Sequence, residues 1–184
     1  MLPIKFALLN HADRVDIWRD RLVCRDLDRS IDRFRQFIAN CKARDERLSI
    51  ITHSFGDWIV RQALQKSPDN QVDALVSIAP VIARSPVGIV LNCLGGSFAS
   101  EVSVIANASR AAENAVVTTT VRRLVIWGYF DIWVRPFAMP EIDNQTVEHF
   151  FATHLSIVMQ PNVLRLVSGF LNSRTEIRRI VGIT

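Results

Sequence analysis

Short apolar runs alternate along the chain with stretches in which apolar residues recur at helical spacing. Helical spacing begins near Ser30, Trp58 and Pro161. The apolar runs are rich in β-branched residues, as buried strands are, and they lie at 4–10, 21–27, 47–53, 72–80 and 121–128, with a further apparent strand in "VEHFF". This alternation predicts an α/β fold with a mostly parallel sheet and helices on both faces.

The predicted helices carry recognisable start signals. Asp28 or Ser30 is a suitable N-cap for the first helix, since a short polar side chain can accept from the first free backbone amides. Pro161 suits the first turn of the last helix, where no amide hydrogen is needed. We therefore expect helices from about residue 30 and from about residue 161.

Length and organisation indicate one domain over residues 1–184, with no internal repeat and no linker. The segment 81–120 lies between two predicted strands and is largely apolar around Gly95 and Gly96. Two interpretations of this segment stay open. It is either a mobile cap or lid over a site, or an ordinary helix with connecting loops.

The positive net charge of +4 raises the question of nucleic-acid binding. Within residues 13–35, however, seven Arg alternate with six Asp. Mixed charges at this density indicate an ion-paired, solvated surface rather than a stripe that follows phosphates. The charge pattern therefore favours a protein that does not bind nucleic acid.

The composition also bears on membrane insertion, on disulfides and metal sites, and on the compartment of the protein. No apolar run reaches the roughly 20 residues of a transmembrane helix, and the start of the chain lacks the features of a signal peptide. The three cysteines, Cys24, Cys41 and Cys93, are widely spaced and predict reduced core residues rather than a disulfide framework or zinc site. We expect a cytoplasmic protein without a metal or organic cofactor.

The stretch "IITHSFGDWIV" carries the strongest chemical signal, because it turns directly from a predicted strand into a predicted helix at Ser54. A serine hydroxyl needs a neighbouring base, and that base needs an orienting acid. Asp131 follows the strand at 121–128, and His154 precedes the last helix. Because parallel strands gather site residues at their carboxyl ends, Ser54, Asp131 and His154 are expected to meet there.

Other residues compete for these roles. Asp143 is the alternative acid, and His149 is the alternative base, although its place within an apparent strand favours a packed or surface histidine. His53 directly precedes Ser54 and is expected to be a structural neighbour rather than the base.

The segments "ITHSFGDWIVRQAL", "LVIWGYFDIWV" and "THLSIVMQPNVLRLVSGFL" resemble the α/β-hydrolase superfamily, in particular small bacterial lipase-like esterases related to triacylglycerol lipases and GPI-inositol-deacylase-like proteins. The resemblance covers roughly residues 22–171. It implies Ser54 as nucleophile, Asp131 as acid and His154 as base, with the backbone N–H of Phe55 as one oxyanion donor. The nearby Trp133 and Phe137 are candidates for lining an acyl pocket.

Two residues depart from the family pattern. Thr52 stands where the elbow usually has its first glycine, and Asp57 stands where relatives mostly have a second one. A carboxylate at position 57 suits the start of a helix but, close to the nucleophile, would disfavour an oxyanion. Asp57 therefore raises the alternative of an impaired enzyme.

The second oxyanion donor is expected in the loop after the strand at 4–10, near Ala12. Only about a dozen residues separate this strand from the one at 21–27, which is too few for a crossover helix. Either the first helix is reduced to a turn, or the strand at 4–10 corresponds to a later strand of the fold. In both versions the fold is reduced at its amino terminus.

Together these features predict a serine hydrolase that cleaves carboxylic esters through an acyl-serine intermediate. A thioesterase or acyltransferase would use the same three residues, and a hydrolase-like binding scaffold is the alternative outside enzymes. The apolar segment 81–120 favours neutral small-molecule or lipid esters as substrates, since a charge is costly to desolvate in such a pocket.

Overall fold

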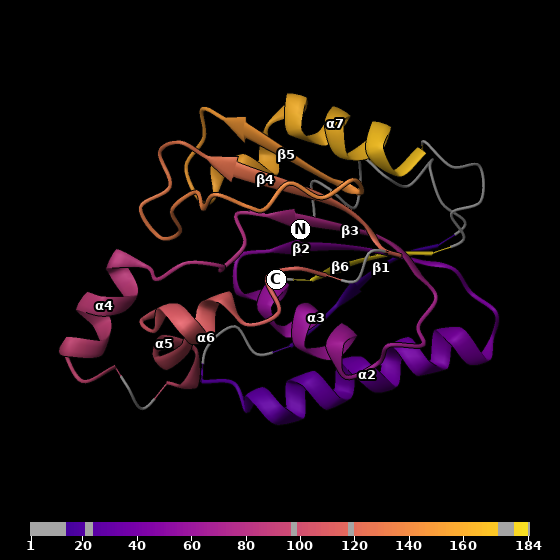
Figure 1. Ribbon diagram of the computed structural model, residues 1–184, viewed down its shortest axis with the longest axis horizontal. Coiled ribbons are helices and arrows are strands. Elements are labelled where there is room, and N and C mark those ends of the chain that lie inside the picture. The colour runs from indigo at the N-terminus through magenta and orange to yellow at the C-terminus, as the bar shows by residue number, and fades with distance from the viewer. Residues whose placement is uncertain (1–13, 21–23, 97–98, 118–119, 173–178, 184) are drawn as a thin grey trace.

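A computed structural model describes residues 14–20, 24–96, 99–117, 120–172 and 179–183. Its centre is a six-stranded sheet in which every adjacent pair is parallel, in the order β1-β6-β2-β3-β4-β5 (Figure 1). The strands are β1 (Arg14–Trp18), β2 (Leu48–His53), β3 (Val72–Ile78), β4 (Arg122–Gly128), β5 (Gln145–Phe150) and β6 (Arg179–Ile183). The predicted α/β class with a parallel sheet is confirmed.

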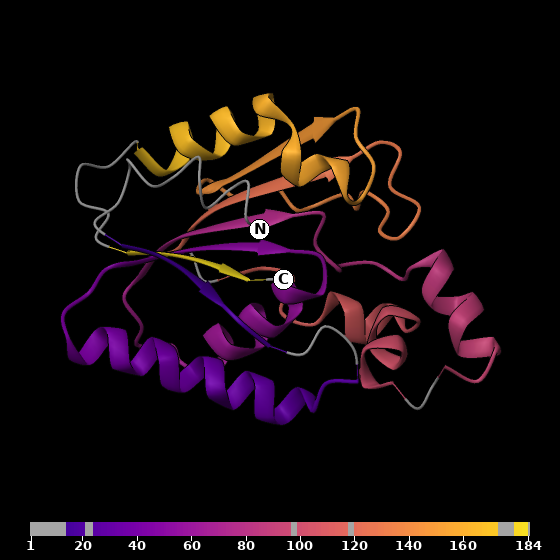
Figure 2. The ribbon, with the colours of Figure 1, turned by 180° about the vertical axis from the view of Figure 1, so that it is seen from behind.

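Helices cover both faces of the sheet, as predicted. Helices α2 (Leu27–Ala43) and α3 (Phe55–Gln65) lie on one face, and α7 (Pro161–Asn172) lies on the other with the short 3-10 helix η2 (Ser156–Met159) (Figures 1 and 2). The last helix begins at Pro161, where the sequence predicts it. Helix α2 begins earlier than predicted, because Asp26 rather than Asp28 or Ser30 caps it by accepting from the amide of Arg29.

The two faces are set by the alternation of side chains along each strand. In β2, Ile50 packs with α2 and α3, whereas Ile51 packs with α7. The next two residues continue this alternation. Thr52 thus belongs to the α3 face and His53 to the α7 face, which decides what each side chain contacts at the end of the strand.

The amino-terminal prediction is wrong in part. The strand predicted at 4–10 lies outside the described residues, and the strand predicted at 21–27 is not seen over its described part. Cys24 lies in a bend, and Leu27 already begins α2. The observed strand, β1, occupies Arg14–Trp18, which the sequence pattern left as a connection.

The sequence pattern also missed β6, which enters the sheet between β1 and β2. All five of its residues are buried. Its first residue, Arg179, pairs with Asp16 of β1 and with Glu46 just before β2. These contacts join the start of β6 to the middle of β1 and to the residues just before β2.

The segment between β3 and β4 forms α4 (Pro86–Cys93), α5 (Ser100–Ile105) and α6 (Ala108–Ala112), beyond the carboxyl edge of the sheet (Figure 1). Hydrogen bonds hold α5 and α6 to the body of the protein: Ser100 Oγ donates to the carbonyl of Arg25, and Trp58 Nε1 donates to that of Arg110. Helix α4 packs closely on α5. The glycine at position 88 permits this approach, because a side chain there would collide with Ile105. The cap function of this segment stays a prediction.

The cysteine prediction holds only for Cys41. All three cysteines are free, but Cys24 and Cys93 are exposed, while Cys41 alone is buried. None of the helices within the described ranges is long and apolar enough to cross a membrane.

Candidate active site

Ser54 lies at a sharp turn between β2 and α3. Its backbone has φ 56° and ψ −125°, in the positive-φ region that residues other than glycine rarely occupy. Its amide is held by the carbonyl of Ile78 at the end of β3. A strained serine between a buried strand and a helix is the geometry of a nucleophile elbow.

The elbow lies against the end of β6. A Cβ atom on Gly56 would come within 3.0 Å of the Cγ2 atom and 3.1 Å of the carbonyl oxygen of Ile183. The glycine therefore lets the first turn of α3 approach this strand more closely than a larger residue would without a shift of Ile183. On that side of β2, the end of β6 is the backbone that the structure places beside the elbow.

Asp131 and His154 follow the carboxyl ends of β4 and β5, and the structure brings their side chains together. Nδ1 of His154 lies 2.6 Å from Oδ2 of Asp131. The other carboxylate oxygen of Asp131 accepts from the amides of Trp133 and Val134, at 2.8 and 2.9 Å. Since these amides fix the carboxylate, its remaining oxygen is aimed at the imidazole.

A close backbone approach draws these two loops together. The amide of Phe130 donates to the carbonyl of Ala152, and a Cβ on Gly128 would lie only 2.7 Å from the same oxygen. Gly128 therefore allows the loop that carries Asp131 to pack directly on the loop that carries His154.

The competing residues lie elsewhere. Asp143 comes before β5 and hence near the amino edge of the sheet, opposite to Ser54. His149 is within β5, and its ring stacks on Tyr129, with the centroids 5.4 Å apart. This is the packed or surface position that the sequence favours for His149.

His53 contacts His154 in two ways. Its Nε2 lies 2.9 Å from the backbone carbonyl oxygen of His154, and the two rings are 4.7 Å apart at 40°. Because a carbonyl can only accept, Nε2 of His53 carries a hydrogen. Burial, and then the neighbouring His154, lower the pKa of His53 to about 4, so its ring is neutral near pH 7.

The side chain of Asp57 lies in a buried polar cluster on the α3 face of the sheet. Its carboxylate lies 2.7 Å from Nε of Arg61, 3.4 Å from Nη2 of Arg123, 2.6 Å from the hydroxyl of Ser77 and 3.3 Å from that of Thr52. Burial opposes the charge of Asp57, but Arg123, Arg61 and Ser77 outweigh it and lower the pKa of Asp57. The positive charges of Arg61 and Arg123 thus compensate the negative charge of Asp57.

The two arginines extend the cluster to the segment beyond the sheet. Arg61 donates to the carbonyls of Val81, Ala111 and Glu113, and Arg123 donates to that of Ala115. Sequence reasoning missed both arginines. Asp57 with Arg61 one helical turn later is a signal that would have found Arg61, since a buried carboxylate needs a partner. No local signal points to Arg123, which is 66 residues away in the chain.

The two predicted oxyanion donors have different outcomes. The amide of Phe55 opens α3, where the first backbone N–H groups have no acceptor within the helix. Ala12 lies outside the described residues. The predicted loop would continue through Arg14–Asp16, but these described residues form the amino end of β1. They lie away from the carboxyl edge at which Ser54 lies. The prediction of a loop there is wrong.

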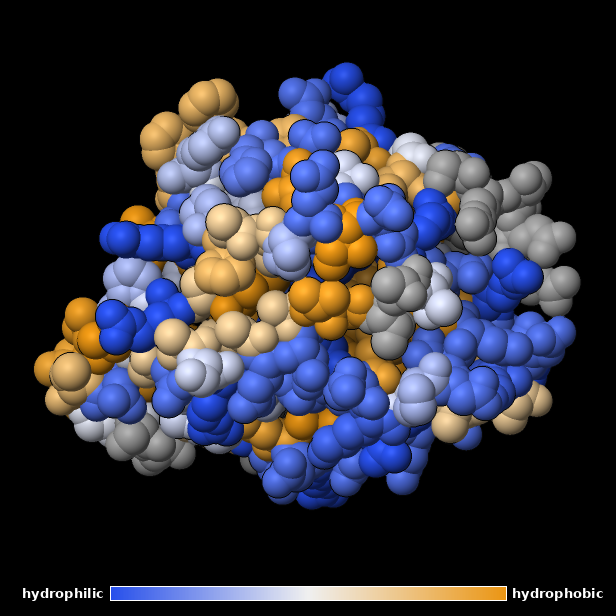
Figure 3. All heavy atoms as spheres, in the orientation of Figure 1, coloured by the Kyte–Doolittle hydropathy of each residue, from blue (hydrophilic) through white to orange (hydrophobic). Residues whose placement is uncertain are grey.

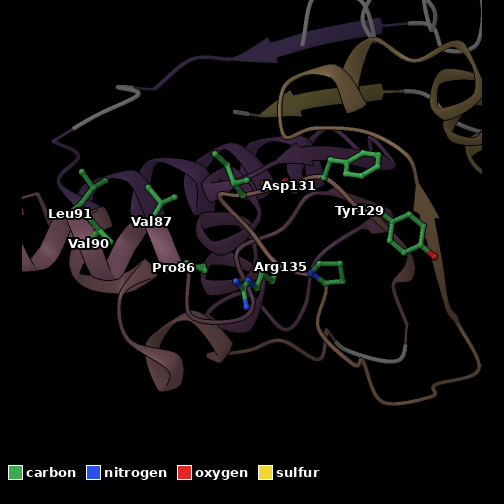
Figure 4. A pocket seen from close by; sticks show the side chains of 10 residues that line it. Pro86, Val87, Val90, Leu91, Tyr129, Asp131 and Arg135 are labelled. Carbon is green, nitrogen blue, oxygen red and sulfur yellow. The ribbon is translucent and has the colours of Figure 1, made fainter.

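A cavity of about 870 Å³ opens between α4 and the loop that follows β4 (Figure 4). It reaches the candidate site through Asp131, and Ser54 does not line it. The lining is mainly apolar, with Arg135 as its cation, and consists of Pro86, Val87, Val90, Leu91, Tyr129, Phe130, Asp131, Ile132, Arg135 and Pro136. Trp133 and Phe137 are not part of it, although the ring of Trp133 lies 6.4 Å from that of His154.

Large apolar side chains remain exposed around this edge. They come from α4 and the residue after it, from the loops after β4 and β5, and from η2. Figure 3 shows apolar residues in orange at the α4 end of the molecule. The set comprises Val90, Leu91, Leu94, Tyr129, Phe130, Ile132, Trp133, Phe151, Leu155 and Met159. An apolar rim of this extent fits a site that receives apolar molecules.

Metal ligation has no candidate in the described part of the chain, where no group of three or more His, Cys, Asp or Glu side chains is arranged to hold an ion. At the carboxyl edge the structure joins His154 to Asp131 and places Ser54 at the end of the nearby strand β2. A carboxylate paired with an imidazole is suited to proton transfer.

Solved structures with a similar fold are hydrolases. The monoacylglycerol lipase of Paleococcus ferrophilus has a TM-score of 0.59 at 15% identity, over 82% of this chain and 76% of the lipase. A serine hydrolase from the bacterium Cycloclasticus zankles, which degrades polyaromatic hydrocarbons, has a TM-score of 0.53 at 13% identity, over 86% of this chain and 76% of that enzyme. These similarities establish the α/β-hydrolase fold.

Among curated proteins, none has significant sequence similarity to this chain. A family model, in contrast, matches most of its length. This model describes the lipid-droplet associated hydrolases and covers residues 23–182, from just before α2 to β6. The chain therefore belongs to the lipid-droplet associated hydrolase family.

Proposed function

We propose that this protein is a serine hydrolase that cleaves the carboxylic ester bond of neutral lipids, with Ser54, His154 and Asp131 as its catalytic residues. The observation that carries the proposal is the 2.6 Å contact between His154 Nδ1 and Asp131 Oδ2 at the sheet edge where the strained Ser54 lies. Acyl transfer needs three groups, namely a serine, an imidazole and an acid that orients the imidazole. Here the serine is strained, and the acid is held by two amides.

In this mechanism Asp131 holds the proton on Nδ1 of His154, which leaves Nε2 free to act as base. His154 takes the hydroxyl proton of Ser54 as the oxygen attacks the ester carbonyl. The same proton then passes to the leaving alkoxide, and an acyl-serine remains. Water, activated by His154, releases the fatty acid and restores the serine.

The negative oxygen of the tetrahedral intermediate needs donors that are already in place. The amide of Phe55, at the start of α3, is suited to this role because the positive end of the helix dipole adds to it. Asp57 lies in the same turn, but its pairing with Arg61 and Arg123 removes its repulsion of the oxyanion.

The family and the surface support a lipid ester as substrate. The family model describes lipid-droplet hydrolases, and the cavity beside Asp131 is mainly apolar. The exposed apolar side chains around it would contact an acyl chain or the lipid from which the chain is drawn. A charged substrate would lose its hydration there without gaining a matching set of partners.

The test is covalent labelling with a fluorophosphonate, followed by mass spectrometry to locate the modified residue. We expect labelling at Ser54 and hydrolysis of a neutral ester such as a monoacylglycerol. Ser54→Ala should abolish labelling and lower turnover by about 10⁶-fold. Ser67→Ala, at a partly buried serine after α3, serves as the matched control and should leave both unchanged.

Labelling of another serine, or full activity in Ser54→Ala, would contradict the proposed nucleophile. A folded wild-type chain that is neither labelled nor active would contradict the hydrolase function itself and favour a binding scaffold.

A further inference from the structure

His53 is the last residue of β2, and its side chain is buried. It lies on the α7 face of the sheet, which is also the face of η2 and of the loop that carries His154. The mechanism above gives His53 no role in transferring protons. Its contacts with His154 therefore need a separate explanation.

The first contact fixes backbone. His154 sits in a short connection between β5 and η2, and its carbonyl oxygen accepts from Nε2 of His53 at 2.9 Å. Since the residue after His53 is Ser54, this bond joins the backbone of the proposed base to the residue adjacent to the proposed nucleophile. A shift of one loop relative to the other would stretch it.

The second contact fixes the ring. The imidazole of His154 lies 4.7 Å from that of His53 and 6.4 Å from the ring of Trp133, while Asp131 holds its Nδ1. Asp131 sets which nitrogen is protonated, but a single hydrogen bond leaves the ring free to tilt. The ring of His53 limits that tilt.

We infer that His53 is a positioning residue, which holds the backbone and ring of His154 in a fixed position relative to Ser54. This inference rests on the proposed function, because the position of His154 relative to Ser54 matters only if His154 acts on Ser54. A displacement of about 1 Å in such a pair can lower turnover about 10²-fold. The neutral form of His53 also serves this role, since a second positive charge would oppose the imidazolium that His154 becomes during the reaction.

Two substitutions separate positioning from simple packing. His53→Met fills a similar volume without a hydrogen-bond donor, whereas His53→Gln keeps an N–H donor near the position of Nε2. We expect His53→Met to lower kcat by 10- to 100-fold with little change in KM, and His53→Gln to recover most of that loss. Urea unfolding at pH 7.5 checks that both variants are folded, and His149→Gln is the matched control, at a histidine of β5 whose ring stacks on Tyr129.

A readout independent of activity is the tautomer of His53 in ¹⁵N NMR spectra of the wild-type chain, with resonances assigned through the variants. The inference requires protonated Nε2 and unprotonated Nδ1. The opposite tautomer overturns it, as does equal turnover of the folded Met and Gln variants.

The failure of the proposed function looks different from the failure of this inference. If wild-type protein is not labelled at Ser54, the proposed function is overturned, and His53 then has no catalytic residue to position. A labelled wild type in which the folded His53→Met variant keeps full turnover overturns the positioning role alone.

Discussion

Nδ1 of His154 lies 2.6 Å from Oδ2 of Asp131, although 23 residues separate them in the chain. The two residues follow neighbouring parallel strands, β4 and β5, and Gly128 lets their loops touch. The contact gives His154 a defined tautomer, with its proton on Nδ1.

This contact predicts the effect of changing the acid. Asp131→Asn keeps the size of the side chain but lets its amide donate to Nδ1, which favours the wrong imidazole tautomer. We expect turnover of a neutral ester to fall by up to about 10⁴-fold. Asp143→Asn, at the competing acid near the amino edge of the sheet, should keep nearly full turnover. If Asp143→Asn loses turnover while Asp131→Asn keeps it, Asp143 is the acid and the assignment is reversed.

The choice between two histidines gives a second prediction. His154→Ala should be nearly as damaging as loss of Ser54, because the serine then has no base. His149→Ala removes a ring that stacks on Tyr129 at the surface of β5, and the folded variant should keep most of its activity. Steady-state kinetics with a soluble ester distinguishes them, provided that circular dichroism shows both variants folded. Similar losses in the two variants would count against the special role of His154.

The sequence predicted where the candidate residues lie in the fold, because local patterns determine those places. Ser54 stands at a change from strand to helix periodicity, and Asp131 and His154 each follow an apolar run. Strand β6 escaped prediction because it is short and belongs to a sheet only through distant partners. Its burial depends on β1 and β2, more than 120 residues earlier in the chain.

The role of Asp57 could not be predicted for the same reason. Position 57 alone suggests an anion beside the nucleophile, but its charge is balanced by Arg123 from β4, which only the fold brings near. The contact of His53 with the carbonyl of His154 likewise spans 101 residues. Local periodicity predicts which residues are buried, but it does not identify their polar partners.

Buried His53 predicts a dependence of stability on pH. Burial and the adjacent His154 lower its pKa from 6.5 to about 4, while Asp131 acts in the opposite direction. Between these values the unfolded chain binds a proton that the folded chain excludes, so the free energy of unfolding decreases as pH falls. The full loss is about 3 kcal/mol for a shift of this size.

The variant His53→Gln isolates this contribution, because glutamine does not titrate. Urea unfolding at pH 7.5 and pH 4.5 should show a larger decrease for the wild type than for the variant. Equal decreases in the two proteins would mean that His53 has an ordinary pKa in the folded state.

The buried ion cluster predicts a large loss of stability when its anion is removed. Asp57→Asn leaves the guanidinium groups of Arg61 and Arg123 buried without a counter-charge. We expect the free energy of unfolding in urea to fall by about 3–5 kcal/mol. Asp32→Asn breaks an exposed pair with Arg35 and should change it by less than about 1 kcal/mol. A small effect at Asp57 would show that water reaches the cluster.

On the proposed function, the cavity between α4 and the loop after β4 predicts how turnover depends on the length of the acyl chain. Leu91 lines this cavity, whereas Leu94, at the end of the same helix, does not and is 78% exposed. In the wild type, each methylene that enters the cavity should raise kcat/KM about fourfold, which corresponds to about 0.8 kcal/mol. Leu91→Ser should flatten this dependence by making the wall polar, and Leu94→Ser should leave it unchanged. Comparing esters of increasing acyl length in the three proteins measures the slope, and an unaltered slope in Leu91→Ser would place the acyl chain outside this cavity.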